Sequence, residues 1–169
     1  MNGKLTLTIS ANLEILDYTD DDDERLIALL RELQSHESQY YDRMIKPSDL
    51  SGWYIDEIKK DCHDHSGRIR VARLDGLVVG YCVVLTRVRN EGPDELPFDY
   101  SYVSELVVSE AMRGKGIGKA LLGDAETIAR ASGAKWLRVH VLAKNTMAYE
   151  VYASYGFKDH LVEMEKLLE

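Results

Sequence analysis

A glycine-rich turn stands between an apolar run and a helical pattern near the middle of the chain. The turn alternates glycine with other residues and carries two lysines: Gly114, Lys115, Gly116, Ile117, Gly118 and Lys119. The first N–H groups of a helix have no partner inside the helix, and glycine leaves them uncovered, so a turn of this kind can bind phosphate oxygens. The lysines add positive charge at the same place. The sequence therefore favours a phosphate-binding turn over a basic surface turn that needs glycine only for flexibility.

The spacing of the turn excludes two common phosphate loops. A P-loop needs a glycine five positions before its Gly-Lys pair and Ser or Thr after it, but Arg113 and Ala120 occupy those positions. The fingerprint Gly-x-Gly-x-x-Gly needs a glycine where Lys119 stands. The pattern that remains is Arg113-x-x-Gly116-x-Gly118. It resembles the coenzyme A pyrophosphate loop of the Gcn5-related N-acetyltransferase (GNAT) superfamily.

A second pattern farther along the chain strengthens this resemblance. The run from Asn145 to Phe157 is similar to the family motif Asn-x-x-Ala-x-x-x-Tyr-x-x-x-Gly-Phe at every position. Asn145 and Tyr152 stand about two helical turns apart, so they share one helix face. Alone, Asn145 would be read as a helix cap and Tyr152 as a packing tyrosine. Because both motifs occur in the expected order, the chain is identified as a member of the superfamily.

Hydrophobic patterns predict an order of elements that resembles the GNAT order along nearly the whole chain. The predicted strands are 13–18, 68–74, 77–88, 100–108, 134–142 and 157–167. The predicted helices are 22–34, 49–61, 117–132 and 145–155. Asp75-Gly76 predicts a hairpin turn. We expect an α/β fold with one domain over residues 1–169 and a mixed, mostly antiparallel central sheet flanked by helices. The resemblance implies that the central strands splay apart.

The resemblance also implies transfer of an acetyl group from acetyl-CoA to a primary amine. Backbone N–H groups of the turn would hold the pyrophosphate, and the backbone of the preceding strand would pair with the pantetheine arm. One N–H of that strand would polarise the thioester carbonyl. The residues expected to contact acetyl-CoA are Leu106, Val107, Val108, Arg113, Gly114, Lys115, Gly116, Ile117, Gly118, Lys119 and Asn145.

Two residues, Glu105 and Tyr152, are the expected catalytic pair. A lysine-like amine has a pKa of about 10.4, so it arrives protonated and must lose a proton before it attacks. Glu105 would accept that proton directly or through water, or would orient the substrate; the alternative is a sheet-edge carboxylate. His140 is the rival base, because some relatives carry a catalytic glutamate five residues before Asn145. The resemblance gives Tyr152 the role of protonating the coenzyme A thiolate.

Charge and composition limit the partners. The chain has 169 residues and a formal net charge of −8, which argues against nucleic acid and suits a cationic small molecule. No run approaches the ~20 apolar residues of a membrane helix, and the first residues do not resemble an export signal. We therefore expect a cytoplasmic protein without membrane association.

Metal binding is not expected. Cys62, His63 and His65 stand together, but a zinc site needs a second set of ligands that the sequence does not supply. The run Asp20 to Asp23 lacks the spaced ligands and the glycine of a calcium loop. Acidic residues interact favourably with the dipole at the start of a helix, so we expect a helix to begin at this acidic run.

The identity of the acceptor amine is the part of the reaction that the sequence determines least. Residues 35–54 combine tyrosines with acidic side chains, which can line an amine site or equally form a helix surface packed by a neighbour. Acceptor choice would depend on the loops 35–65 and 89–99. We expect a small cationic amine. The alternatives are a protein lysine or N-terminal acetyltransferase and a non-catalytic acetyl-CoA-binding regulator, and a homodimer is considered because homodimers are common in the family.

Overall fold

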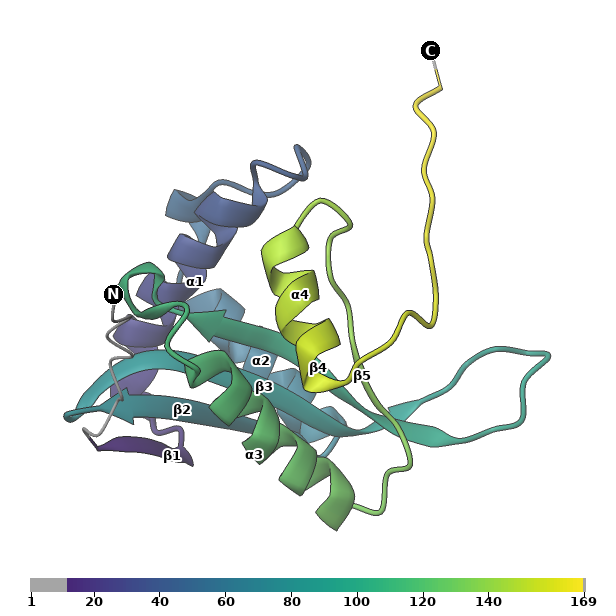
Figure 1. Cartoon of the computed structure of the whole chain (residues 1–169), viewed down its shortest axis with the longest axis horizontal. Coiled ribbons are helices and arrows are strands. Elements are labelled where there is room, and N and C mark those ends of the chain that lie inside the picture. The colour runs from purple at the N-terminus through teal and green to yellow at the C-terminus, as the bar shows by residue number, and fades with distance from the viewer. Residues whose placement is uncertain (1–11, 169) are drawn as a thin grey trace, which may run out of the picture.

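The structure, a computed structural model, describes residues 12–168 and is built on a five-stranded sheet (Figure 1). Its strands, which lie in chain order across the sheet, are β1 (Leu13–Asp17), β2 (Arg68–Leu74), β3 (Leu77–Arg89), β4 (Asp99–Val108) and β5 (Leu137–Val139). Neighbouring strands from β1 to β4 pair antiparallel, and β5 pairs parallel to β4. The predicted mixed, mostly antiparallel sheet is confirmed.

Helices cover both faces of the sheet (Figure 1). They are α1 (Asp23–Glu37) and α2 (Gly52–Asp64) on one face, and α3 (Ile117–Ala131) and α4 (Thr146–Tyr155) on the other. Successive side chains of β3 point to opposite faces, so Tyr81 and Val83 pack with α1 and α2, while Cys82 and Val84 pack with α3. A strand covered on both faces is apolar almost throughout, which explains the long apolar run of β3.

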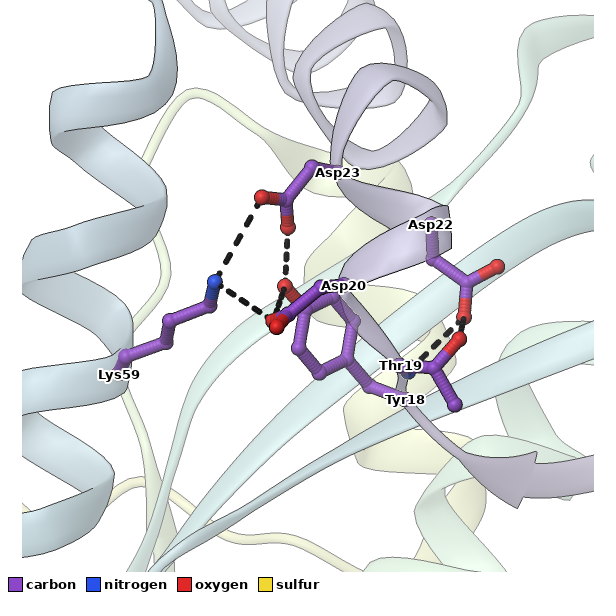
Figure 2. Close-up of polar contacts among 6 residues, drawn as sticks. All are labelled: Tyr18, Thr19, Asp20, Asp22, Asp23 and Lys59. Atoms are coloured by element: carbon purple, nitrogen blue, oxygen red, sulfur yellow. Dashed lines mark hydrogen bonds and ion pairs between the residues drawn. The ribbon is translucent and has the colours of Figure 1, made fainter.

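The acidic run before α1 forms the start of that helix (Figure 2). The Thr19 N–H donates to the Asp22 carboxylate over 3.1 Å. Lys59 of α2 lies 2.9 Å from Asp20 and 3.5 Å from Asp23. The aspartates therefore stand at the positive end of the helix dipole, as predicted, and also join α1 to α2.

Most predicted boundaries hold to within a few residues. Asp75 and Gly76 both have positive φ, 50° and 82°, the backbone of a hairpin turn whose twist matches the flanking strands. Gly133 has φ 82° and follows the end of α3, as its helix-stop pattern predicts. The second helix begins at Gly52, later than predicted, because Pro47–Asp49 forms a separate 3-10 turn.

The sheet opens between β4 and β5. The two strands pair at only three positions, Ser101 with Leu137, Tyr102 with Arg138 and Val103 with Val139. Beyond them, β4 continues to Val108 with no strand on that side among residues 12–168. This is the predicted splay. It also makes β5 shorter than the predicted strand 134–142, because residues past Val139 have no neighbour with which to pair.

The prediction of a last strand over residues 157–167 is wrong. After α4 the chain runs through residues 157–168 without regular secondary structure (Figure 1). The sequence there suits a strand, but a strand exists only where a neighbouring strand accepts its hydrogen bonds. In the described part of the chain none does.

Candidate active site

A bulge in β4 sets the direction of the side chains beside the gap. Val83 of β3 is opposite Glu105, but Val84 is opposite Val103, so Ser104 has no partner. Side chains normally alternate along a strand, and Val103 and Glu105 would then share one face. Instead Val103 packs on the α3 face, while the Glu105 carboxylate meets Tyr54 of α2 on the other face.

The same bulge sets the direction of the backbone. Before it, the Ser101 N–H donates to the Trp136 carbonyl beside β5 over 2.9 Å. After it, the Ser109 N–H donates to the Val79 carbonyl of β3 over 2.8 Å. Because N–H groups alternate along a strand, those of Leu106 and Val108 point toward the gap. Contact of these N–H groups with the pantetheine arm stays a prediction.

Val107 lies differently from its two neighbours. Its side chain is 1% exposed in the core with α1 and α2, and its backbone pairs with Tyr81 of β3. The carbonyl of Val108 faces the other way and accepts a hydrogen bond from Arg113 Nε over 3.2 Å. Arg113 therefore braces the glycine turn against the end of β4.

The glycine turn is open and its helix is uncapped. Gly114 and Gly116 have φ values of 73° and 85°, and no heavy atom lies within 4 Å of a Cβ built at either position. No side chain caps the start of α3 at Gly116. Ile117 is 1% exposed and anchors the turn in the core, whereas Lys115 and Lys119 are exposed. The first N–H groups of α3 are thus available to an anion, which fits the diphosphate of coenzyme A.

Glu105 lies in a partly buried cluster of phenols and acids. Tyr54 donates its hydroxyl hydrogen to Glu105 Oε1 over 2.8 Å. Burial raises the pKa of Glu105 to about 7; the hydrogen bond from Tyr54 opposes this rise, and the negative charge of Glu37 adds to it. A carboxyl group with this pKa can take up and release a proton near neutral pH.

Tyr152 of α4 packs against the core on the α3 face of the sheet. Burial raises its pKa well above the usual value, and the nearby acidic groups, including Glu37 and Glu105, raise it further. The phenol therefore stays protonated at neutral pH and can act as a donor. The charge of Glu105 therefore acts on the Tyr152 phenol, although Tyr152 packs on the α3 face and Glu105 bonds Tyr54 on the other face.

Asn145 caps α4. Its side chain is buried, with Oδ1 accepting the N–H of Ala148 over 3.2 Å. Burial raises the pKa of Glu37, and a hydrogen bond with Asn145 opposes part of this rise. This cap fixes the start of the helix that carries Tyr152, and direct contact of Asn145 with a cofactor stays a prediction. His140 is exposed past the end of β5, with its ring 5.1 Å from that of Tyr102.

Comparison with known proteins identifies the family. A family model described as the acetyltransferase (GNAT) family matches residues 21–157. The chain belongs to the GNAT family.

Relatives of this GNAT chain are distant. The uncharacterized N-acetyltransferase YycN of Bacillus subtilis is 34% identical over 74 residues, which are 44% of this chain and 47% of YycN, so the match spans about half of that relative. A transcriptional regulator from Bacillus halodurans C-125 has a TM-score of 0.71 at 19% identity, covering 93% of this chain and 100% of that one. AAC(6')-Iy, solved with a bisubstrate analog, has a TM-score of 0.66 at 17% identity, covering 94% and 100%. The two solved structures show the shared fold.

Sequence reasoning on this GNAT chain placed Glu37 and Tyr54 in a segment that could line an amine site but did not link them to Glu105, and it missed Tyr102. The Tyr54–Glu105 hydrogen bond joins residues 51 positions apart, and no local spacing rule relates them. One signal was available for Tyr54, which stands one helical turn before the buried Ile58, on the apolar stripe of α2. A hydroxyl group on an apolar stripe needs a buried polar partner.

The acidic, histidine and cysteine side chains of this GNAT chain form no metal-binding group within residues 12–168, because no three of them gather in a way that could hold a metal ion. Cys62 is instead partly buried and packs against the core with α2. Across the same residues, no helix has the length and apolar character needed to cross a membrane.

Proposed function

We propose that this protein is an acetyl-CoA-dependent N-acetyltransferase whose acceptor is a small cationic primary amine. The observation that carries the proposal is the position of Glu105. Its partly buried carboxyl group lies in β4 directly before the residues whose backbone faces the gap, and its charge acts on the phenol of Tyr152. The acetyl group is supplied as a thioester, and the amine attacks it directly while both substrates are bound.

Acetyl-CoA would be held by the chain from Leu106 to Lys119. The open turn and the first N–H groups of α3 suit the diphosphate, and the exposed Lys115 and Lys119 add charge attraction. The outward backbone of Leu106 and Val108 suits the pantetheine arm. An N–H at Leu106 is also placed to polarise the thioester carbonyl.

Proton transfer completes the reaction. The ammonium group gives a proton to Glu105, and the free amine forms a bond to the acetyl carbon while the carbon–sulfur bond breaks. Tyr152 gives its proton to the departing thiolate, and the new amide nitrogen releases its second proton to water. Tyr152 and Glu105 then regain their starting protonation states by exchange with solvent. His140 is the less suitable base, because it is exposed and lies beyond β5.

The surroundings of Glu105 favour a cationic acceptor. The carboxyl groups of Glu37 and Glu105 attract positive charge, and the rings of Tyr54 and Tyr102 offer faces to an ammonium group. The hydroxyl of Tyr81 is fully buried and has no hydrogen-bond partner among the described residues. A polar group of a bound substrate, or a water beside it, would satisfy this hydroxyl.

An amine-panel assay tests the proposed function. Coenzyme A thiol release is measured with polyamines, aminoglycosides and amino acid amines, with lysine peptides alongside. We expect release with amines that carry a second positive charge, and little with neutral amides of similar size. Release with peptides alone would indicate a protein acetyltransferase. Binding of acetyl-CoA without release for any acceptor would indicate a non-catalytic regulator, and either result would contradict the proposal. A cytoplasmic location and a homodimer remain predictions.

Replacing Tyr152 with phenylalanine is expected to lower kcat about 30-fold and to leave the acetyl-CoA Kd nearly unchanged. The change removes the proton donor, but a thiolate with a pKa of about 8.5 leaves without much help, so the expected loss is smaller than the ~100-fold at the low end for acid catalysis. The matched control is Tyr149→Phe on the same helix, an exposed tyrosine that bonds Asp159. Equal losses of kcat and affinity in Tyr152→Phe would mean that the hydroxyl only builds the site.

Replacing Tyr54 with phenylalanine is expected to move the acidic limb of the kcat/KM profile to higher pH. The Tyr54 hydrogen bond stabilises the ionised form of Glu105, so its loss raises the pKa of that carboxyl group further. The protonated, inactive form then persists to higher pH. Tyr102→Phe is the control, because Tyr102 makes no hydrogen bond to Glu105. If the acidic limb of Tyr54→Phe does not move, Glu105 is not the group whose titration produces that limb.

A further inference from the structure

The hydroxyl group of Tyr81 is a buried polar group that the reaction proposed above does not use. Tyr81 lies in β3 and is 0% exposed. Its hydroxyl has no hydrogen-bond partner among residues 12–168. Burial raises the pKa of this phenol well above its ordinary value, so the group keeps its proton. A buried hydroxyl without a protein partner is typically paired with an ordered water, because leaving it unpaired costs free energy.

The register of the sheet places Tyr81 beside Glu105. β3 and β4 run side by side (Figure 1), and Glu105 pairs with Val83, two residues past Tyr81 on β3. Tyr81 and Val83 pack in the core with α1 and α2, and the bulge turns Glu105 to that same face. Tyr81 and Glu105 are therefore diagonal neighbours across the two strands, a separation that an aromatic side chain can span. The charge of Glu105 raises the pKa of Tyr81 further, yet no hydrogen bond joins the two groups.

The Glu105 carboxylate has one oxygen without a protein donor. Tyr54 donates to Oε1 over 2.8 Å, and no second side chain of residues 12–168 donates to this carboxylate. The titratable groups that interact with Glu105 come from both faces of the sheet: Glu37, Tyr54, Tyr81, Cys82, Tyr102 and Tyr152. No lysine or arginine in the described part of the chain acts on it. Since an ionised carboxylate accepts several hydrogen bonds, its second oxygen, Oε2, can accept one from water.

We propose that Tyr81 is a positioning residue for Glu105: its hydroxyl donates a hydrogen bond to one ordered water, and that water donates to Oε2 of the Glu105 carboxylate. The inference rests on the proposed role of Glu105 as the base of the reaction. Tyr54 then holds one carboxylate oxygen directly, and Tyr81 holds the other through the water. Both hydrogen bonds favour the ionised carboxylate, which is the form that takes the ammonium proton. Tyr81 itself exchanges no proton in the reaction.

Replacing Tyr81 with phenylalanine tests this role, because the change removes the hydroxyl and keeps the ring. The pKa of Glu105 is measured by carbon NMR of labelled carboxyl groups in the protein without substrates, and its signal is assigned by its absence in Glu105→Gln. We expect this pKa to rise from about 7 by about 0.5–1 unit, since a hydrogen bond to the ionised form is lost. The value of kcat/KM should then fall about three- to tenfold at about pH 6 and stay nearly unchanged at about pH 9.

Tyr100→Phe is the matched control. Tyr100 is a half-buried tyrosine near the start of β4, and its ring centroid lies 4.2 Å from the guanidinium carbon of Arg138. The change removes a phenol hydroxyl from the same sheet, and it is expected to leave the pKa of Glu105 and the kcat/KM profile unchanged. A crystal structure of the wild-type protein gives a second measurement. It is expected to show a water within hydrogen-bond distance of both the Tyr81 hydroxyl and Glu105 Oε2.

An unchanged or lowered pKa of Glu105 in Tyr81→Phe would overturn the positioning role, and so would a wild-type crystal structure with no water at the Tyr81 hydroxyl. Equal losses of kcat/KM at the two pH values would mean that Tyr81 is only structural. Should the variant fold poorly, the wild-type water decides the question. The NMR titration needs no turnover, so it separates this inference from the proposed function. A raised pKa in Tyr81→Phe of a protein that acetylates no amine would support the positioning of Glu105 and contradict the proposed function.

Discussion

Gly116→Val is expected to weaken acetyl-CoA binding about 100-fold, which corresponds to about 2.7 kcal/mol. Gly116 starts α3 at φ 85°, and the space around it is open. A valine there would fill the space where a diphosphate oxygen approaches the first helical N–H groups, and a β-branched residue disfavours this backbone. Titration calorimetry with acetyl-CoA measures the loss.

Gly133→Val is the matched control for this change. Gly133 has φ 82° and open space around it, but it lies at the opposite end of α3. Both variants carry similar backbone strain, expected to cost about 1–2 kcal/mol of folding stability. Only Gly116→Val is expected to lose affinity. If the two variants bind acetyl-CoA with equal affinity, the glycine turn is not the diphosphate site.

Glu105→Gln is expected to lower kcat/KM about 1,000-fold and to abolish the acidic limb of the pH profile. In the wild type, Glu105 is protonated below its pKa of about 7 and cannot accept the ammonium proton. Activity should therefore rise with pH up to about 7, tenfold per pH unit on the steep part, and then level. Glutamine keeps the size of the side chain and a hydrogen bond from Tyr54, but it cannot take the proton.

Glu150→Gln is the control for the loss of a negative charge, since Glu150 is exposed on α4. It is expected to leave both kcat/KM and its acidic limb unchanged. If Glu105→Gln retains the acidic limb, another group produces that limb, and His140 is the next residue to test. A small loss of activity without a change in the profile would give Glu105 an orienting role only.

Local signals explain what the sequence could predict. The turn at Asp75-Gly76, the helix stop at Gly133 and the cap at Asn145 each depend on residues a few positions apart, and the structure has all three. The glycine turn belongs to the same class. Its backbone requires positive φ at Gly114 and Gly116, which the spacing of the glycines anticipates.

Features that depend on distant partners could not be predicted in this way. The bulge at Ser104 follows from the register between β3 and β4, and it turns Glu105 toward Tyr54. Glu37 reaches the cluster through the packing of α1. The segment 157–167 has the pattern of a strand but no neighbour among the described residues, so its extended form stays unpaired. Register and partner choice are properties of the assembled sheet.

Amide chemical shifts recorded during an acetyl-CoA titration test the central claim most directly. The account predicts that the largest changes fall at the amides of residues 114–119 and at those of Leu106 and Val108, with β1 and β2 little affected. The N–H groups that α3 leaves uncapped and those that β4 directs into the gap would then report one bound molecule. Large changes elsewhere, with none in the turn or at Leu106, would contradict it.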